Sequence, residues 1–189
     1  MSNLGKWNKW YESVTDQMPF GDSESYVIGA KFLEDCEVVE DWGCGLGWFS
    51  KFRPNGYFGV DGSDSPFASK IVDLEEYTSF VDGIFMRHVL EHNYRWKTIL
   101  ANALKSFRKK MVVVVFTPWS PGNTREISFV DRVGVPNISF NKQEFLERLV
   151  EFEWELIELT LSNTMFGQEH IFLVQKNEKN QFRDPTVDA

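Results

Sequence analysis

The chain has 189 residues, of which 42% are hydrophobic and 25% are charged, with a formal net charge of −8. This length suits one domain with a single large core, and the acidic balance argues against nucleic acid as a partner. No apolar stretch is long enough to span a membrane, and residues 1–10 do not read as a signal sequence. The two cysteines, Cys36 and Cys44, do not form a C-x-x-C pair, so we expect neither a zinc site nor a disulfide framework, and we expect a cytoplasmic protein.

The first 35 residues are rich in aromatic side chains and predict a helical cap on the domain. Two short helices fit this stretch, separated by the turn-forming residues 19–22. We expect a single domain over residues 1–176. The polar residues 177–189 predict a disordered tail.

A short strand followed by a glycine-rich turn is the most informative pattern in the chain. The strand is predicted over Val38–Trp42, and Asp41 lies near its end. Three glycines follow at alternate positions: Gly43, Gly45 and Gly47. Glycine adopts positive φ angles and lets a ligand approach the backbone closely. A helix predicted from Trp48 would direct its first N–H groups at this loop, so the pattern indicates a nucleotide-type cofactor site.

The glycine spacing separates the candidate cofactors. A dinucleotide fingerprint, G-x-G-x-x-G, would need its third glycine where Trp48 stands, and a P-loop would end in G-K-[ST]. The observed acid-x-G-x-G-x-G order resembles the first motif of class I S-adenosylmethionine-dependent methyltransferases. The resemblance assigns five residues to cofactor binding: Asp41, Gly43, Cys44, Gly45 and Gly47. The alternative is a plain glycine-rich turn between strand and helix.

Two further strands, predicted over Tyr57–Asp61 and Lys70–Asp73, each end in an acid, with a helix or turn near residues 66–69 between them. Asp61, followed by Gly62, stands where a carboxylate binds the hydroxyls of a ribose. By the resemblance, Asp73 accepts from the adenine amino group and the N–H of Leu74 meets the ring. The alternatives are a strand-end turn for Asp61 and a helix cap for Asp73.

A strand predicted over Gly83–His88 leads into Val-Leu-Glu-His at residues 89–92. This segment is similar to the fourth strand of the methyltransferase group that includes the ubiquinone and menaquinone biosynthetic enzymes. The resemblance places Arg87 and His88 at the cofactor, beside the methyl donor. His88 and His92 are candidate general bases because histidine titrates near neutral pH. For His92 the alternative is a hydrogen bond that only anchors the turn.

The order His88, Glu91, His92 also resembles the E-x-x-E-H metal cluster of the small-RNA 3′-end 2′-O-methyltransferases, which add a distant histidine before a helix. The corresponding stretch here, residues 135–140, contains no histidine, and the first ligand is changed. We therefore predict no metal site, and an anchoring role for Glu91. The acceptor motif [DNS]-P-P-[YF] of DNA amino-methyltransferases is also absent.

The second half of the chain alternates helical and extended patterns. Apolar residues at three- and four-residue steps predict a helix over Arg95–Lys110, with a basic cluster at its end. The apolar run Met111–Phe116 predicts a strand buried on both faces, and Thr117–Ser139 a long functional loop. A capped helix is predicted from Asn141, with Glu144 completing a capping box and Phe140 and Phe145 forming a staple. The closing strand pair is predicted over residues 155–162 and 170–176.

This order of elements predicts an α/β protein, and the resemblance implies a three-layer αβα sandwich. Its Rossmann-like, mostly parallel seven-stranded sheet would have an antiparallel last strand. The implied function is transfer of a methyl group from S-adenosylmethionine to an O, N or C acceptor on a small molecule. The alternatives are a nicotinamide-dependent oxidoreductase and a non-catalytic cofactor-binding subunit. The acceptor and the oligomeric state stay open.

Overall fold

The computed structural model describes residues 4–14 and 16–177, so the tail predicted for 177–189 lies outside these residues except for Asn177. Seven strands form one sheet in the order β3-β2-β1-β4-β5-β9-β8. Their bounds are β1 Val39–Trp42, β2 Tyr57–Asp61, β3 Lys70–Ile71, β4 Val81–Arg87, β5 Phe107–Val115, β8 Glu153–Leu159 and β9 Glu169–Gln175. The first five strands pair in parallel, and β9 runs antiparallel to both β5 and β8. The predicted mostly parallel sheet with an antiparallel last strand is confirmed.

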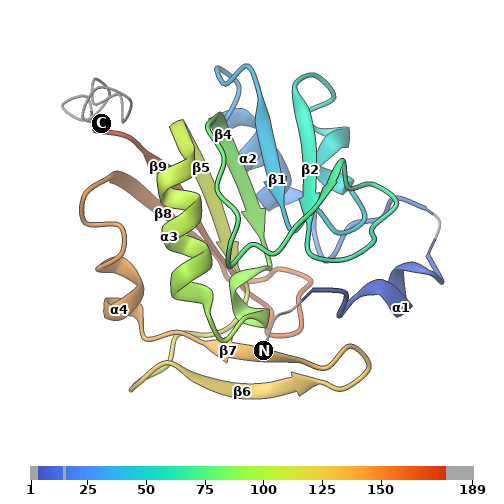
Figure 1. Cartoon of the computed structure of the whole chain (residues 1–189). Helices are drawn as coiled ribbons and strands as arrows, with labels where there is room; N and C mark the ends of the chain where they lie inside the picture. Colours follow the sequence, from blue (N-terminus) through green and yellow to red (C-terminus); the bar gives the residue numbers. More distant parts are fainter. Residues whose placement is uncertain (1–3, 15, 178–189) are drawn as a thin grey trace.

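Helices cover both faces of the sheet (Figure 1). Helix α2 (Glu24–Phe32) lies on one face, and α3 (Trp96–Ser106) and α4 (Lys142–Leu146) lie on the other. The valines of β5 explain why this strand is apolar throughout. Val112 and Val114 belong to the core under α2, whereas Val113 and Val115 belong to the core under α3. The predicted three-layer αβα sandwich is confirmed.

The boundary between α3 and β5 differs from the prediction. The helix ends at Ser106, and residues 107–110, predicted as its last turn, begin β5 because Phe107 pairs with Val81 of β4. Of the predicted basic cluster, Lys105 lies in the last turn of α3, but Arg108, Lys109 and Lys110 lie in β5. Arg108 and Lys109 approach the carboxylate of Asp82, and Lys110 Nζ lies 2.8 Å from Asp35 Oδ1.

The helix predicted from Trp48 is a single 3₁₀ turn, η1 (Trp48–Lys51). Two features end it early: Pro54 disfavours a helical conformation at Arg53, and Gly56 turns the chain with φ +68°. Phe49 is fully buried and anchors this turn to the α2 face. The glycine loop is consequently not followed by a long helix, and β3 is also shorter than predicted, ending at Ile71.

The sequence predicts a loop over Thr117–Ser139, but the structure forms a β-hairpin within it. Strands β6 (Arg125–Val130) and β7 (Val135–Ser139) pair antiparallel, with Gly134 at φ +68° in the turn. Pro136 obscured the second strand, because proline is normally a weak strand former. The hairpin and the short helix α1 (Asn8–Tyr11) lie across the end of the sheet where the parallel strands finish (Figure 1).

The cap and the hydrophobic staple predicted at the start of α4 are confirmed, whereas Glu144 does not close the capping box directly. Asn141 Oδ1 accepts the Glu144 N–H at 2.8 Å, and the Phe140 and Phe145 rings lie 5.5 Å apart. The capping box closes through a third residue: the Asn141 N–H donates to Thr124 Oγ1 at 2.9 Å, and the Thr124 hydroxyl meets the Glu144 carboxylate. Among the described residues, no helix is long and apolar enough to cross a membrane.

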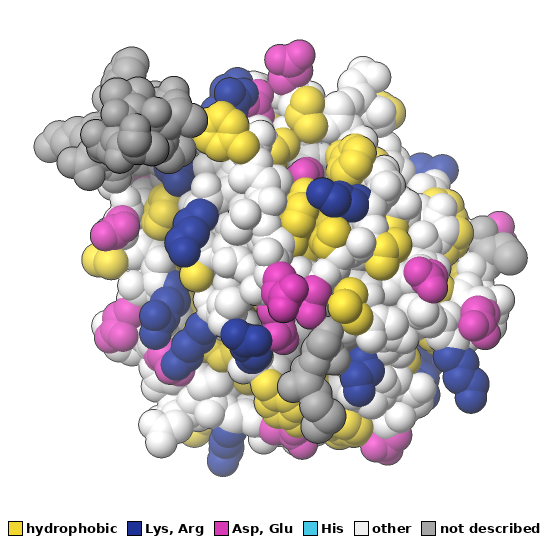
Figure 2. Space-filling model, in the orientation of Figure 1, with side chains coloured by type: hydrophobic (Ala, Val, Ile, Leu, Met, Phe, Trp, Pro, Cys, Tyr) yellow, Lys and Arg dark blue, Asp and Glu magenta, His cyan; other side chains and the backbone are white. Residues whose placement is uncertain are grey.

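Charged side chains of both signs are interleaved over α3 and α4 (Figure 2). Lys97 pairs with Glu144, and Lys142 Nζ lies 3.4 Å from Glu158 Oε1. This face is therefore mixed in charge rather than a continuous basic patch.

Candidate functional site

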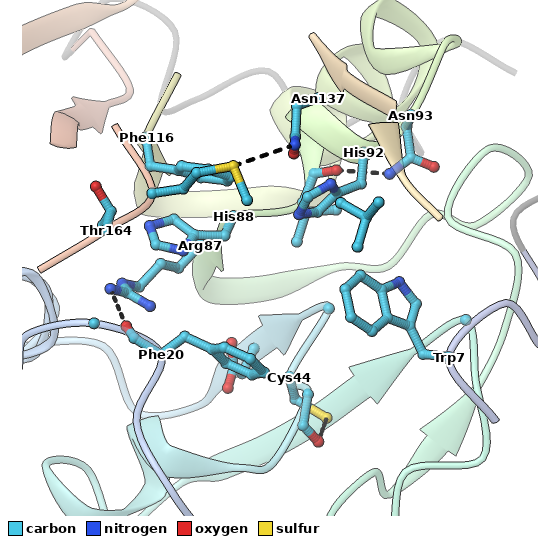
Figure 3. A pocket seen from close by; sticks show the side chains of 18 of the residues that line it. Trp7, Phe20, Cys44, Arg87, His88, His92, Asn93, Phe116, Asn137 and Thr164 are labelled. Atoms are coloured by element: carbon cyan, nitrogen blue, oxygen red, sulfur yellow. Dashed lines mark hydrogen bonds between the residues drawn. The ribbon is translucent and has the colours of Figure 1, made fainter. Parts of the chain in front are cut away.

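A cavity of about 360 Å³ lies at the carboxyl ends of the parallel strands (Figure 3). Nine of the residues predicted to bind or act on ligands line it: Asp41, Gly43, Cys44, Gly45, Gly62, Leu74, Arg87, His88 and His92. The aromatic cap supplies Trp7, Tyr11 and Phe20, and the hairpin supplies Val130, Arg132 and Asn137. The cavity thus collects segments from the whole length of the chain.

The first glycine of the loop is required by a close approach. Gly43 has φ +74°, and its N–H donates to the Val60 carbonyl at 2.7 Å. A Cβ on Gly43 would lie only 2.3 Å from Cγ2 of Val89, in the segment after β4. The absence of a side chain lets the glycine loop and this segment border one cavity.

Asp41 lies at the cavity wall with its carboxylate almost fully buried. Its Oδ2 accepts a hydrogen bond of 3.1 Å from the Tyr57 hydroxyl. Burial raises the pKa of Asp41 to about 8, and the hydrogen bond from Tyr57 only partly opposes this shift. A cation entering the cavity beside Asp41 would favour the ionised carboxylate.

Asp61 lies behind the glycine loop and is not among the residues that line the cavity. Its two oxygens accept the N–H groups of Gly45 and Ser63, each at 2.9 Å. Burial raises the pKa of Asp61 to about 6, opposed by these backbone hydrogen bonds and by the Tyr11 hydroxyl. In this conformation Asp61 ties the glycine loop to the end of β2.

Two other predicted cofactor residues, Asp73 and Gly47, also lie outside the cavity wall. Asp73 Oδ1 accepts the Glu75 N–H at 2.9 Å within a turn at residues 74–76, where the structure has no helix for Asp73 to cap. Gly47 has φ +66°, and a Cβ there would lie 2.6 Å from Cβ of Phe67. Both residues shape the segments that carry the site.

The Arg87 guanidinium is buried in a network that joins three parts of the chain. It donates to Ser25 Oγ and the Tyr26 hydroxyl of α2, at 2.9 and 3.0 Å. Nη2 donates to the Phe20 carbonyl and to Glu169 Oε1, both at 2.6 Å. The positive charge of Arg87 is therefore compensated inside the protein.

His88 presents its ring to the cavity from a left-handed backbone conformation, φ 58°. Its Nε2 lies 2.7 Å from Glu169 Oε1, and its ring centroid lies 4.6 Å from that of Phe116. Burial, reinforced by the Arg87 charge, lowers the pKa of His88 to about 3, so the ring is neutral at pH 7. Among the described residues, Nδ1 has no hydrogen-bond partner.

Glu91 and His92 do not share the hydrogen-bond partner of His88. Glu91 Oε1 accepts the Phe116 N–H at 2.6 Å, which is the kind of anchoring contact expected of it. His92 Nδ1 lies 2.9 Å from the Pro136 carbonyl, and since a carbonyl only accepts, Nδ1 carries the proton. In the part of the chain that the structure describes, no group of three or more His, Cys, Asp or Glu side chains is arranged to hold a metal ion.

Sequence reasoning missed two polar residues of the site, Glu169 and Asn137. Glu169 stands at the start of the apolar run of β9, and an acid in a buried strand is the signal that points to it. Asn137 is 1% exposed and lines the cavity; its Nδ2 donates to Ser128 Oγ at 2.8 Å. It lies in the hairpin of β6 and β7, a segment for which the sequence predicts a loop.

Comparison with solved structures identifies the fold. The structure is similar to 1,6-didemethyltoxoflavin-N1-methyltransferase of Burkholderia thailandensis, with a TM-score of 0.63 and 19% identity over 82% of this chain and 77% of that one. The chain has the class I methyltransferase fold. Magnesium protoporphyrin IX methyltransferase of Synechocystis PCC 6803 shares it, with a TM-score of 0.59 and 13% identity over 81% of this chain and 78% of that one.

The N-terminal domain of EvdMO1 also has this methyltransferase fold, with a TM-score of 0.60 and 11% identity over 89% of this chain and 93% of that one. The first and third of these proteins were solved with S-adenosylhomocysteine and the second with S-adenosylmethionine. No family model and no curated protein matches the sequence.

Proposed function

We propose that this chain is an S-adenosylmethionine-dependent methyltransferase that acts on a small molecule, with one domain over residues 1–176. The observation that carries the proposal is the cavity between Asp41 and the glycine loop on one side and Arg87 and His88 on the other. It lies at the carboxyl ends of β1 and β4, where the strand order reverses and α/β sheets bind ligands.

The residues at the cavity fit the cofactor chemically. Asp41 is a buried carboxylate whose ionised form would be stabilised by the cationic amino-acid end of S-adenosylmethionine. The backbone of Gly43, Cys44 and Gly45 is accessible from the cavity. A side chain on Gly43 would collide with Val89 and obstruct this part of the cavity. Gly62 and Leu74 also line the cavity and would border the adenosine. Three solved structures of similar fold, 11–19% identical to this chain, contain S-adenosylmethionine or S-adenosylhomocysteine. This similarity supports the cofactor assignment without naming an acceptor.

To bind the cofactor, Asp61 and Asp73 would replace some of their present contacts with contacts to the ligand. Asp61 would reach ribose hydroxyls in place of its interaction with Tyr11, while keeping the Gly45 N–H bond. Asp73 would reach the adenine amino group while its Oδ1 continues to cap the turn at Glu75.

When bound, the cofactor supplies an electrophilic methyl group on sulfur, and transfer is an in-line displacement to an O, N or C acceptor. The chain contributes a cavity that would orient the acceptor, an effect worth roughly 7–11 kcal/mol in favourable cases. A general base adds roughly 10²–10⁴-fold. Both histidines have one ring nitrogen in a hydrogen bond, His92 with the Pro136 carbonyl and His88 with the Glu169 carboxylate. His88 is the stronger candidate, because a carboxylate stabilises a protonated ring more than a carbonyl does.

The test is a calorimetric and thermal-shift titration with S-adenosylhomocysteine, with NAD run in parallel. At a hundred times its dissociation constant the ligand should stabilise the fold by about 2.7 kcal/mol. Asp41→Ala and Asp61→Ala should lose this affinity while remaining folded. Stabilisation by NAD alone would indicate the oxidoreductase, for which Trp48 replaces the required glycine. Binding without methyl transfer to any acceptor would indicate the non-catalytic subunit.

A further inference from the structure

One buried carboxylate connects the last strand of the sheet to the candidate base. Glu169 is 0% exposed and begins β9. Its Oε1 is shared by two neighbours, His88 Nε2 at 2.7 Å and Arg87 Nη2 at 2.6 Å. Glu169 itself is not among the residues that line the cavity, so it acts on the cavity through His88.

The contact with Glu169 determines which nitrogen of His88 carries the proton. An ionised carboxylate only accepts hydrogen bonds, so Nε2 of the neutral ring must be the donor. The lone pair then resides on Nδ1. Figure 3 shows the His88 ring within the cavity, between Arg87 and Phe116.

Arg87 keeps this carboxylate ionised. Burial alone would raise the pKa of Glu169, but the hydrogen bond to His88 and the Arg87 charge outweigh burial and lower it. Ser25 and Tyr26 of α2 accept from the remaining Arg87 nitrogens and hold the guanidinium in place. Glu169 therefore stays an acceptor, and the orientation of His88 is imposed by residues from α2, β4 and β9.

We propose that Glu169 is a positioning residue that holds His88 with Nδ1 directed into the cavity, where it accepts the proton of an O–H or N–H acceptor. This inference rests on the proposed methyltransferase function. In the transfer, an acceptor lone pair forms the bond to the methyl carbon, and the carbon–sulfur bond breaks with its electron pair left on sulfur. The acceptor proton moves to His88 Nδ1, and Glu169 stabilises the resulting imidazolium.

The charge balance favours this arrangement. The sulfonium loses its positive charge in the same step in which His88 gains one, so the net charge around the cavity is unchanged. Glu169 then faces two cations, His88 and Arg87, and its second oxygen, Oε2, has no partner among the described residues. The low pKa of the resting ring leaves Nδ1 unprotonated, and the loss of the sulfonium charge during transfer would raise the affinity of the ring for the proton.

The test is NMR of protein with ¹⁵N-labelled histidine, free and saturated with S-adenosylhomocysteine. The chain has only three histidines, so His92→Gln and His170→Gln variants assign the signals. In the wild type we expect His88 to stay neutral from pH 8 to 5, with the Nε2–H form in roughly tenfold or greater excess. In Glu169→Leu both tautomers should be populated, and Glu169→Gln should give an intermediate ratio because its Oε1 still accepts from Nε2.

A matched control is Glu158→Gln. Glu158 Oε1 lies 3.3 Å from His170 Nδ1 on the same pair of strands, so this variant should change the His170 signals and leave those of His88 unchanged. A wild-type His88 that carries its proton on Nδ1, or is charged at pH 7, would overturn the proposal even if no variant folds. An unchanged tautomer ratio in Glu169→Leu would overturn it too.

Ligand binding and the His88 tautomer test the proposed function and the role of Glu169 separately. Glu169→Gln should bind S-adenosylhomocysteine within a few-fold of the wild type, because Glu169 is not part of the cavity wall. A wild-type protein that does not bind S-adenosylhomocysteine would contradict the proposed function. A wrong tautomer in a protein that binds would remove only the role of Glu169.

Discussion

Asp82 at the amino end of the central sheet and the acids Asp41 and Glu91 at its carboxyl end are all buried, but their surroundings compensate their charge differently. At the amino end, Asp82 accepts from the Glu37 N–H at 3.0 Å and pairs with Arg108 and Lys109, whose side chains reach solvent. Burial alone would raise the pKa of Asp82, but these contacts lower it to about 2. At the carboxyl end, Asp41 and Glu91 are buried without a cationic hydrogen-bonding partner, and burial raises the pKa of each to about 8.

This difference shows which buried acids lower the free energy of unfolding at neutral pH. A paired acid such as Asp82 favours the folded state at neutral pH, whereas an acid with a raised pKa favours it less as pH rises. Of the acids with a raised pKa, Asp41 lines the cavity, where a cationic ligand would supply the missing charge. Substitutions at both ends of the sheet, and the pH dependence of ligand binding, test this contrast.

Gly43→Ala should be the most damaging change at the carboxyl end. A Cβ would lie 2.3 Å from Val89 Cγ2, and φ +74° disfavours any L side chain. We expect a loss of about 3 kcal/mol in the free energy of unfolding and no measurable S-adenosylhomocysteine binding. Urea denaturation and calorimetry measure the two effects.

Gly122→Ala is the matched control, because a Cβ on Gly122 meets no atom within 4 Å. Its stability and ligand affinity should equal those of the wild type. A Gly43→Ala protein as stable as this control would show that the segment after β4 can move away from the glycine loop.

Glu91→Gln should make the carboxyl end more stable at high pH. With a folded-state pKa near 8 against 4.5 when unfolded, Glu91 holds its proton only in the folded state, so its contribution declines as pH rises from 4.5 to 8. Glutamine has no proton to lose and can still accept the Phe116 N–H. The variant should match the wild type near pH 5 and exceed it by a few kcal/mol at pH 8, measured by urea denaturation.

The affinity for S-adenosylhomocysteine should rise with pH if Asp41 binds its ammonium group. Asp41, with a pKa near 8, must lose its proton to pair, so affinity should increase by up to about tenfold per unit between pH 6 and 8 and then level off. Calorimetry in buffers of different ionisation enthalpy should detect the released proton. Asp41→Asn should bind weakly with no pH dependence over this range; a wild-type affinity independent of pH would contradict the pairing.

Asp82→Asn should have the smallest effect and act only on stability. It removes the charge that pairs with Arg108 and Lys109, both about half exposed, so we expect a loss of about 1 kcal/mol at pH 7. Because the pKa of Asp82 is lowered, the loss should vanish as pH falls from 4 toward 2. Ligand affinity should not change, since Asp82 lies at the far end of the sheet.

The sequence by itself determined the features that depend on neighbouring residues. The strand before the glycine loop, the positive φ of Gly43, the double-sided burial of β5 and the cap at Asn141 all follow from side chains within a few positions. Periodicity and turn chemistry record such local preferences directly. These features were enough to predict the fold class and the part of the cavity wall that the ends of the parallel strands supply.

Only the tertiary structure decided which distant groups meet. Glu169 reaches His88 across 81 positions of sequence, Asp61 turns to the loop at Gly45, and the hairpin brings Asn137 to the cavity. A pairing between separate strands leaves no periodic mark on either one, because it depends on sheet order and on which face each side chain takes. The tautomer of His88 and the buried charges of the site therefore follow from packing, which no single segment of the sequence contains.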